Sequence, residues 1–149
     1  MENRKKWWKY LILFVIFSFL GSFMEYTYGF IGGVGIFYDK AIYQWFEIKI
    51  LFIPYYGLSA IILFLFEQFM ESKKINIIYH GFLNALIITN WEFFSGLFSL
   101  IVFKQRFWNY SNHSFNILGL ISFPMFLRWI MVGYIFSLIY YFILRKIMK

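Results

Sequence analysis

Three ionisable residues lie within long apolar stretches of the sequence and are the first candidates for chemistry: Glu25, Glu92 and Arg128. A charged side chain in the hydrocarbon of a bilayer costs roughly 2.5–3.5 kcal/mol, so such groups usually face protein and have partners. One arginine shared by two carboxylates leaves a carboxylate that can bind a cation or carry a proton. The alternative is a buried Glu92–Arg128 pair that only fixes helix packing, with Glu25 in the membrane interface.

Aromatic and amide side chains surround these charges in the sequence. An aromatic belt at the membrane interface explains many Trp and Tyr positions. It does not explain the Pro54–Gly57 element or Asn116, whose backbone and amide character indicate a specific packed structure. We therefore predict that a substrate or ion site is walled by Tyr55, Tyr56, Trp91, Trp108, Asn109 and Asn116.

Other kinds of chemistry have little support. The absence of cysteine excludes disulfides and thiolate metal sites. His80 and His113 are predicted on opposite sides of the membrane, so they form no shared metal site, and each is expected to be a packing or loop residue. Glu67 lies near a helix end and is expected to be solvated. With no nucleophile motif and no phosphate-binding loop, we expect no cofactor and no enzymatic activity.

The elements that must position these residues are transmembrane helices. The sequence is 62% hydrophobic and only 14% charged, whereas soluble domains are about one quarter charged. Since about 20 apolar residues cross a bilayer, the apolar stretches predict an all-α bundle of about four transmembrane helices. We place these helices at about 8–28, 52–70, 75–103 and 117–144, with a short interfacial helix at about 41–50. The chain from 1 to 149 is then a single integral membrane domain.

Lysine and arginine gather in both terminal flanks and in the loop 71–74, which predicts that both termini are cytoplasmic. The net charge of +7 is thus spread over helix ends, so the expected partner is the lipid bilayer and not nucleic acid. At 1.5 Å per residue, Glu25 and Glu92 lie roughly 26 Å above the inner ends of their helices. Arg128 lies roughly 16 Å below the outer end of the fourth helix, so all three charges can meet in the outer half.

Four short elements resemble those of the CmpB-like ABC-transporter type IV family of small bacterial membrane proteins. They are Gly21 to Glu25, Pro54-Tyr-Tyr-Gly57, Glu92-Phe-Phe-Ser-Gly96, and Trp108-Asn-Tyr-Ser111 followed by Phe115-Asn116 and Gly119-Leu-Ile121. The resemblance covers about residues 10–135 and implies a multi-pass protein of the bacterial cytoplasmic membrane with a role in transport. Asn109 and Leu120 stand where the family has an aspartate and an arginine, so that acid–base pair is missing. Arg128 is our candidate replacement for the arginine.

Three functions remain open from the sequence. The first is a transport component or permease-like subunit with a polar site in the outer half of the bundle; ATP-driven action would need a partner ATPase. The second is a structural or regulatory membrane subunit whose buried charges only stabilise the bundle. The third is an intramembrane enzyme in which Glu92 is the acid–base group. Four helices rarely enclose both a site and a pathway, so a homo-oligomer or another membrane subunit is an expected partner.

Overall fold

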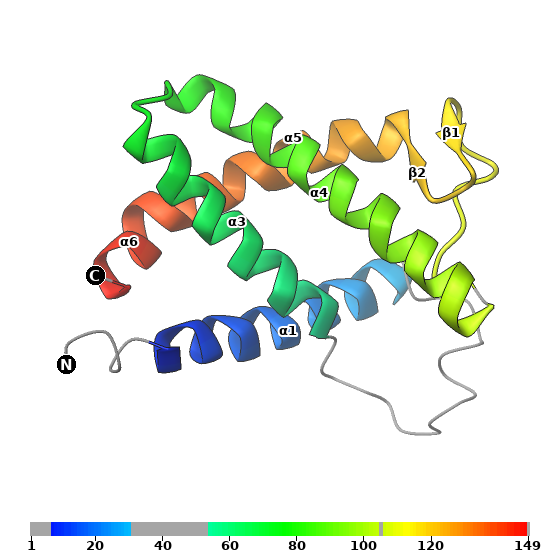
Figure 1. The fold of residues 1–149 in the computed structure, drawn as a ribbon, viewed down its shortest axis with the longest axis horizontal. Helices are drawn as coiled ribbons and strands as arrows, with labels where there is room; N and C mark the ends of the chain where they lie inside the picture. The colour runs from blue at the N-terminus through cyan, green and yellow to red at the C-terminus, as the bar shows by residue number, and fades with distance from the viewer. Residues whose placement is uncertain (1–6, 31–53, 105, 149) are drawn as a thin grey trace.

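The computed structural model describes residues 7–30, 54–104 and 106–148, with the side chains of 25–30 left out. Apart from connecting loops and one short hairpin, the described chain is helical, which confirms the predicted all-α class (Figure 1). The predicted interfacial helix at about 41–50 lies outside the described residues.

The described residues form four long helices, which run alternately in opposite directions along the bundle (Figure 1). They are α1 (Trp7–Phe30), α3 (Pro54–Ser72), α4 (His80–Phe98) and α5 (Phe123–Ile139). A 3-10 turn, Ile77–Tyr79, precedes α4, and a π-helical turn, Ser99–Phe103, continues it. A second π-helical turn, Tyr140–Leu144, joins α5 to the short α6 (Arg145–Ile147).

Three helical stretches among the described residues are long and apolar enough to cross a membrane: Trp7–Met24, Ile77–Phe103 and Phe123–Ile147. The chain is therefore a multi-pass membrane protein. Helix α3 is not among these stretches, and it carries Glu67, Gln68 and Glu71. Its 19 residues extend over about 28 Å, close to the thickness of the hydrocarbon layer. The fourth crossing stays a prediction.

The fourth helix begins later than predicted. Instead of starting near residue 117, α5 starts at Phe123, and the preceding residues form an antiparallel hairpin of β1 (Asn116–Ile117) and β2 (Ile121–Ser122). Leu118 and Gly119 between the strands have φ of 53° and 66°, a left-handed conformation that no right-handed helix contains. Pro124 then lies in the first turn of α5, where backbone N–H groups have no partner within the helix, so the N–H that proline lacks is not missed.

Both described ends of the chain lie at one end of the bundle (Figure 1). Lys9 Nζ, at the start of α1, donates to the carbonyl oxygen of Ile147 at 2.8 Å. Arg145 forms an ion pair with Glu71, at the end of α3, at 2.5 Å. We call this the termini end and the opposite one, which carries β1 and β2, the hairpin end. The shared end agrees with termini on one side of the membrane, while their cytoplasmic location stays a prediction.

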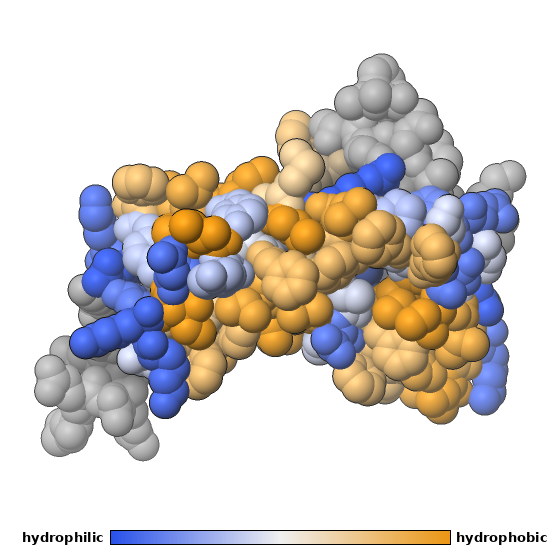
Figure 2. All heavy atoms as spheres, turned by 90° about the horizontal axis from the view of Figure 1, so that it is seen from above, coloured by the Kyte–Doolittle hydropathy of each residue, from blue (hydrophilic) through white to orange (hydrophobic). Residues whose placement is uncertain are grey.

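The helices pack pairwise, with the most extensive contact between α4 and α5 and the next between α1 and α3. The core between them consists of Leu13, Ala60, Leu63, Phe64, Ile88, Phe136, Tyr140 and Leu144. On the face shown in Figure 2, apolar side chains cover most of the middle and hydrophilic ones gather towards both ends. This distribution suits a bundle whose middle faces lipid.

Candidate functional site

Glu92 is almost completely buried near the hairpin end, with 1% of its surface exposed. Its Oε1 accepts a hydrogen bond from the Tyr110 hydroxyl at 2.9 Å. Its Oε2 accepts another from Trp129 Nε1, on α5, at 2.7 Å. The carboxylate thus joins α4 to α5 and to the loop that precedes the hairpin.

Aromatic rings predicted to wall the site do meet beside Glu92. Tyr55, in the first turn of α3, stacks on Trp91 with ring centroids 5.7 Å apart and lies 5.8 Å from Trp108. Tyr56 contacts Tyr55 edge-on at 5.5 Å. The indole Nε1 of Trp108 donates to the carbonyl oxygen of Leu120 at 2.8 Å, which fixes the ring against the hairpin. These four predicted residues therefore form one aromatic cluster.

The predicted site residue Asn109 has a different setting. It is exposed in the loop before the hairpin, and its Oδ1 accepts from Ser111 Oγ at 2.6 Å and from Ser111 N at 3.0 Å. Arg106 Nη1 lies 3.3 Å from the same oxygen. Arg106, only three residues away on the same loop, therefore contacts position 109. The hypothesis that Arg128 takes the place of the family's arginine stays a prediction.

Asn116 also has contacts within this loop. Its Nδ2 donates to the carbonyl oxygens of His113 and Ser111, at 2.9 and 3.2 Å. Its Oδ1 accepts from the backbone N–H of Gly119 at 3.1 Å. Both groups of the side-chain amide hold the hairpin in shape.

Arg128 lies nearer the hairpin end than predicted. Because α5 begins at Phe123, Arg128 is only about 8 Å along the helix from its start. Its side chain is exposed, and its Nη1 contacts Met125 Sδ at 3.5 Å. The side chain of Glu25 lies outside the described residues, so the convergence of Glu25, Glu92 and Arg128 stays a prediction.

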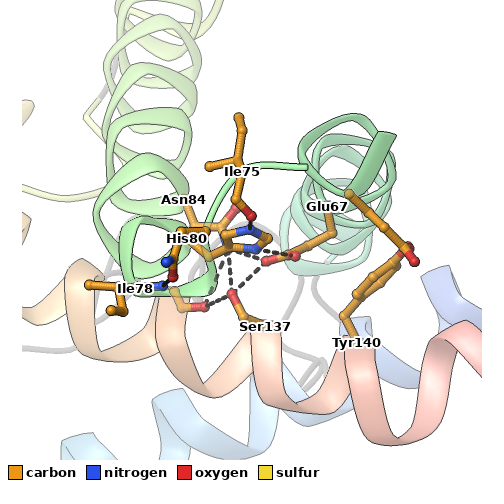
Figure 3. A network of polar contacts seen from close by, with 10 residues as sticks. Glu67, Ile75, Ile78, His80, Asn84, Ser137 and Tyr140 are labelled. Atoms are coloured by element: carbon orange, nitrogen blue, oxygen red, sulfur yellow. Dashed lines mark hydrogen bonds and ion pairs between the residues drawn. The ribbon is translucent and has the colours of Figure 1, made fainter. Parts of the chain in front are cut away.

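A second buried carboxylate, Glu67 on α3, lies at the centre of a polar cluster (Figure 3). We expected this residue to be solvated, and that expectation was wrong, because its side chain is 0% exposed. His80 Nδ1 lies 2.8 Å from Glu67 Oε2. The other oxygen, Oε1, accepts from Asn84 Nδ2 at 2.7 Å and from Ser137 Oγ at 2.5 Å.

Three helices contribute to this cluster, which we call the Glu67 cluster: Glu67, His80, Asn84 and Ser137. His80 and Asn84 are one turn apart at the start of α4, and Ser137 is on α5. Asn84 Nδ2 also lies 3.1 Å from Ser137 Oγ. The signal that could have revealed the cluster was present in the sequence: polar residues four apart in an apolar stretch face the same side of a helix.

The next turn of α3 towards the termini end carries Glu71. Its Oε2 accepts from the Tyr140 hydroxyl at 2.7 Å, and its Oε1 pairs with Arg145. Unlike Glu67, the side chain of Glu71 is 31% exposed. Glu71 therefore provides a control carboxylate on the same helix for experiments on Glu67.

One seam between α4 and α5 contains partners of both buried carboxylates. Asn84 and Glu92 are eight residues apart on the same face of α4, or about 12 Å. Trp129 and Ser137 have the same spacing on α5. Ile88 and Gly133 lie between them, both buried, so the seam is apolar at its middle.

The fold and the site define a multi-pass helical membrane protein with two buried carboxylates in the described part of its interior. The comparisons give the family: residues 12–149 match the model described as "Putative ABC-transporter type IV". The chain therefore belongs to that family, as its four sequence elements predicted. Neither the curated proteins nor the solved structures give a match.

Proposed function

We propose that this chain is the membrane-embedded component of a transporter, a permease-like subunit whose polar site lies around Glu92. The observation that carries the proposal is the 1% exposure of Glu92 within a stretch long and apolar enough to cross a membrane. An ionisable group at such a place is by default a candidate for a substrate or ion pathway. The family description supports a transport role.

The hydrogen bonds of Glu92 suit a group that changes its charge. Trp129 Nε1 can only donate, so Oε2 stays an acceptor. The Tyr110 hydroxyl can donate or accept, so it can form a hydrogen bond with Oε1 whether that oxygen is ionised or carries a proton. Glu92 can therefore gain or lose a proton, or exchange a proton for a cation, without leaving either contact.

Partners are part of this proposal. The sequence has no nucleotide-binding motif, so ATP-driven transport requires a partner ATPase. A second copy of the chain or another membrane subunit would complete the pathway, because about four helices rarely enclose both a site and a pathway. We place the assembly in the bacterial cytoplasmic membrane with both termini in the cytoplasm, which the basic flanks support.

A structural or regulatory subunit is the second candidate. It is favoured by the two hydrogen bonds through which Glu92 links α4 to Tyr110 and Trp129, because these would also brace the bundle. An enzymatic role has less support, since Asn109 and Asn116, the residues expected to position a substrate, are engaged within their own loop. We therefore propose that the chain is not an enzyme.

Glu92→Gln separates transport from bracing. Glutamine can accept from Trp129 and donate to Tyr110, so it retains the fold while losing the charge. In a strain that lacks the gene, we would measure the cellular levels of metal ions and small solutes after complementation. If the chain transports a solute, the wild type and Glu71→Gln should both restore the cellular level of that solute. Glu92→Gln should be at least about tenfold less effective, which corresponds to a free-energy difference of about 1.4 kcal/mol. Full restoration by Glu92→Gln, or no solute that depends on the gene, would overturn the proposal.

A further inference from the structure

The contacts of the His80 ring fix how many protons the Glu67 cluster holds. Nε2 lies 3.1 Å from the carbonyl oxygen of Ile75, which can only accept, so Nε2 carries a hydrogen. Nδ1 lies 2.8 Å from Glu67 Oε2, and a hydrogen bond there requires a second proton on one of the two atoms. Glu67 and His80 therefore share two protons and have no net charge, whether as imidazolium and carboxylate or as imidazole and carboxylic acid.

Loss of one proton has a defined structural consequence. The one hydrogen left on the ring can then serve either Oε2 of Glu67 or the carbonyl oxygen of Ile75, so one of these two contacts must open. The pair would also carry one negative charge, although both side chains are 0% exposed. The carboxylate left behind keeps the donors Asn84 Nδ2 and Ser137 Oγ on Oε1, which stabilise its charge.

Solvent comes close to this pair from the termini end. A cavity of about 280 Å³ lies there, with Phe64, Gln68, Glu71 and Tyr140 among its lining residues. Glu67 is three residues after Phe64 and four before Glu71, so it shares their face of α3. Glu67 thus lies about one turn of α3 from residues that line the cavity.

We propose that Glu67 and His80 form a proton-binding site, which exchanges one proton with water in this cavity and, on losing it, gives up one of the two hydrogen bonds of the His80 ring. The proton leaves the pair for a water molecule and returns to the pair, while the hydrogen that remains on the ring takes Nδ1 or Nε2. The site is distinct from the one around Glu92 and does not depend on the transport role.

Other titratable and charged groups near the pair come from the end of α3 and from the chain that follows α5. Tyr141 lies with its ring 6.0 Å from the His80 ring. Glu71, Tyr140 and Arg145 form a separate hydrogen-bonded group at the mouth of the cavity.

Histidine NMR provides a direct test, because the sequence has only two histidines. In a full-length His113→Gln variant, ¹⁵N-labelled histidine reports on His80 alone. In lipid nanodiscs, between about pH 5 and about pH 9, we expect the His80 ring to show a single one-proton transition. One of its two nitrogen signals should change from protonated to bare while the other keeps its hydrogen. This measurement changes neither Glu67 nor His80, so it is decisive even where variants of the pair do not fold.

Two further variants show whether Glu67 is the partner. Adding Glu67→Gln removes the carboxylate that holds the proton, so the transition should move to lower pH by more than about one unit or leave the range. Adding Glu71→Gln, the matched control, should leave it within about 0.3 units, because Glu71 contacts Tyr140 and Arg145 instead. A folded protein in which both ring-nitrogen signals are invariant, or a transition unchanged by Glu67→Gln, would overturn the proposal; neither result bears on Glu92.

Discussion

At the scale of single residues, hydrogen-bonding side chains surround the carboxyl group of Glu67. Asn84 and Ser137 donate to one oxygen, and His80 is at the other. The free-energy cost of placing a carboxylate in an apolar bundle is offset here by hydrogen bonds to both oxygens. The same hydrogen bonds tie three helices together, so Glu67 contributes to the stability of the bundle.

Glu67→Ala should lower the free energy of unfolding by about 3 kcal/mol, because it leaves buried donors on α4 and α5 without their acceptor. Glu71→Ala removes a partly exposed ion pair and should cost less than about 1 kcal/mol. Detergent-induced unfolding in bicelles measures both variants under identical conditions. Equal losses would mean that the Glu67 cluster does not hold the bundle together.

Burial of Glu92 in protein could be predicted, because it lies far from either end of a long apolar stretch. Burial of Glu67 could not, because hydropathy alone places a carboxylate near a helix end in water. Its partners lie 13, 17 and 70 positions away in the chain. Only the packing of α3 against α4 and α5 decides that they meet.

At the scale of elements, the close packing of α4 against α5 depends on glycine residues. A Cβ atom on Gly133 would lie 2.6 Å from the carbonyl oxygen of Gly81, a backbone atom that cannot move aside. Helices in membranes commonly approach through such small residues, because van der Waals packing replaces the hydrophobic effect there. The same close approach brings Ser137 and Asn84 within hydrogen-bonding distance.

Gly133→Ala should destabilise the protein by about 1–3 kcal/mol, since the two helices must separate to admit the methyl group. Gly96→Ala is the control on α4. Its added Cβ would meet Leu120 Cδ2 at 2.9 Å, the end of a flexible side chain that can turn away, so we expect a smaller loss. Thermal unfolding in nanodiscs compares the two. A Gly133→Ala variant as stable as the wild type would show that the seam is looser than its geometry indicates.

The hairpin shows where reading elements from sequence fails. Ile117, Leu118, Leu120 and Ile121 extend the apolar pattern of the fourth helix, so hydropathy predicts a helix through them. The left-handed backbone of Leu118 ends that continuity, yet leucine gives no sign of such a conformation in advance. The turn becomes apparent only in the structure, where the Asn116 side chain accepts a hydrogen bond from the backbone N–H of Gly119.

At the scale of the whole molecule, the two ends differ in how they hold charge. The termini end combines the Glu71–Arg145 pair, a cavity and the Glu67 cluster behind it. The hairpin end closes Glu92 under Trp129, Tyr110 and the aromatic cluster. Access from the two sides of a membrane would therefore reach different carboxylates, with the apolar Ile88 and Gly133 between them.

Which side each end faces can be measured with single cysteines, because the sequence has none. Asn112→Cys at the hairpin end and Asp39→Cys should react with an impermeant reagent in intact cells. Lys73→Cys, next to the end of α3, should react only after permeabilisation. Positions 112 and 73 are both exposed, so their difference reports the membrane and not burial.

This pattern also decides whether α3 crosses the membrane. Positions 39 and 73 flank α3, and they react from opposite sides only if that helix spans the bilayer. Shared ends for both termini require an even number of crossings, and the contact of Lys9 with Ile147 places those ends together. Three crossings would separate them, so we expect α3 to provide the fourth despite the polar residues that lower its hydropathy. Reaction of position 73 in intact cells, together with positions 39 and 112, would contradict both the crossing and the arrangement of the bundle in the membrane.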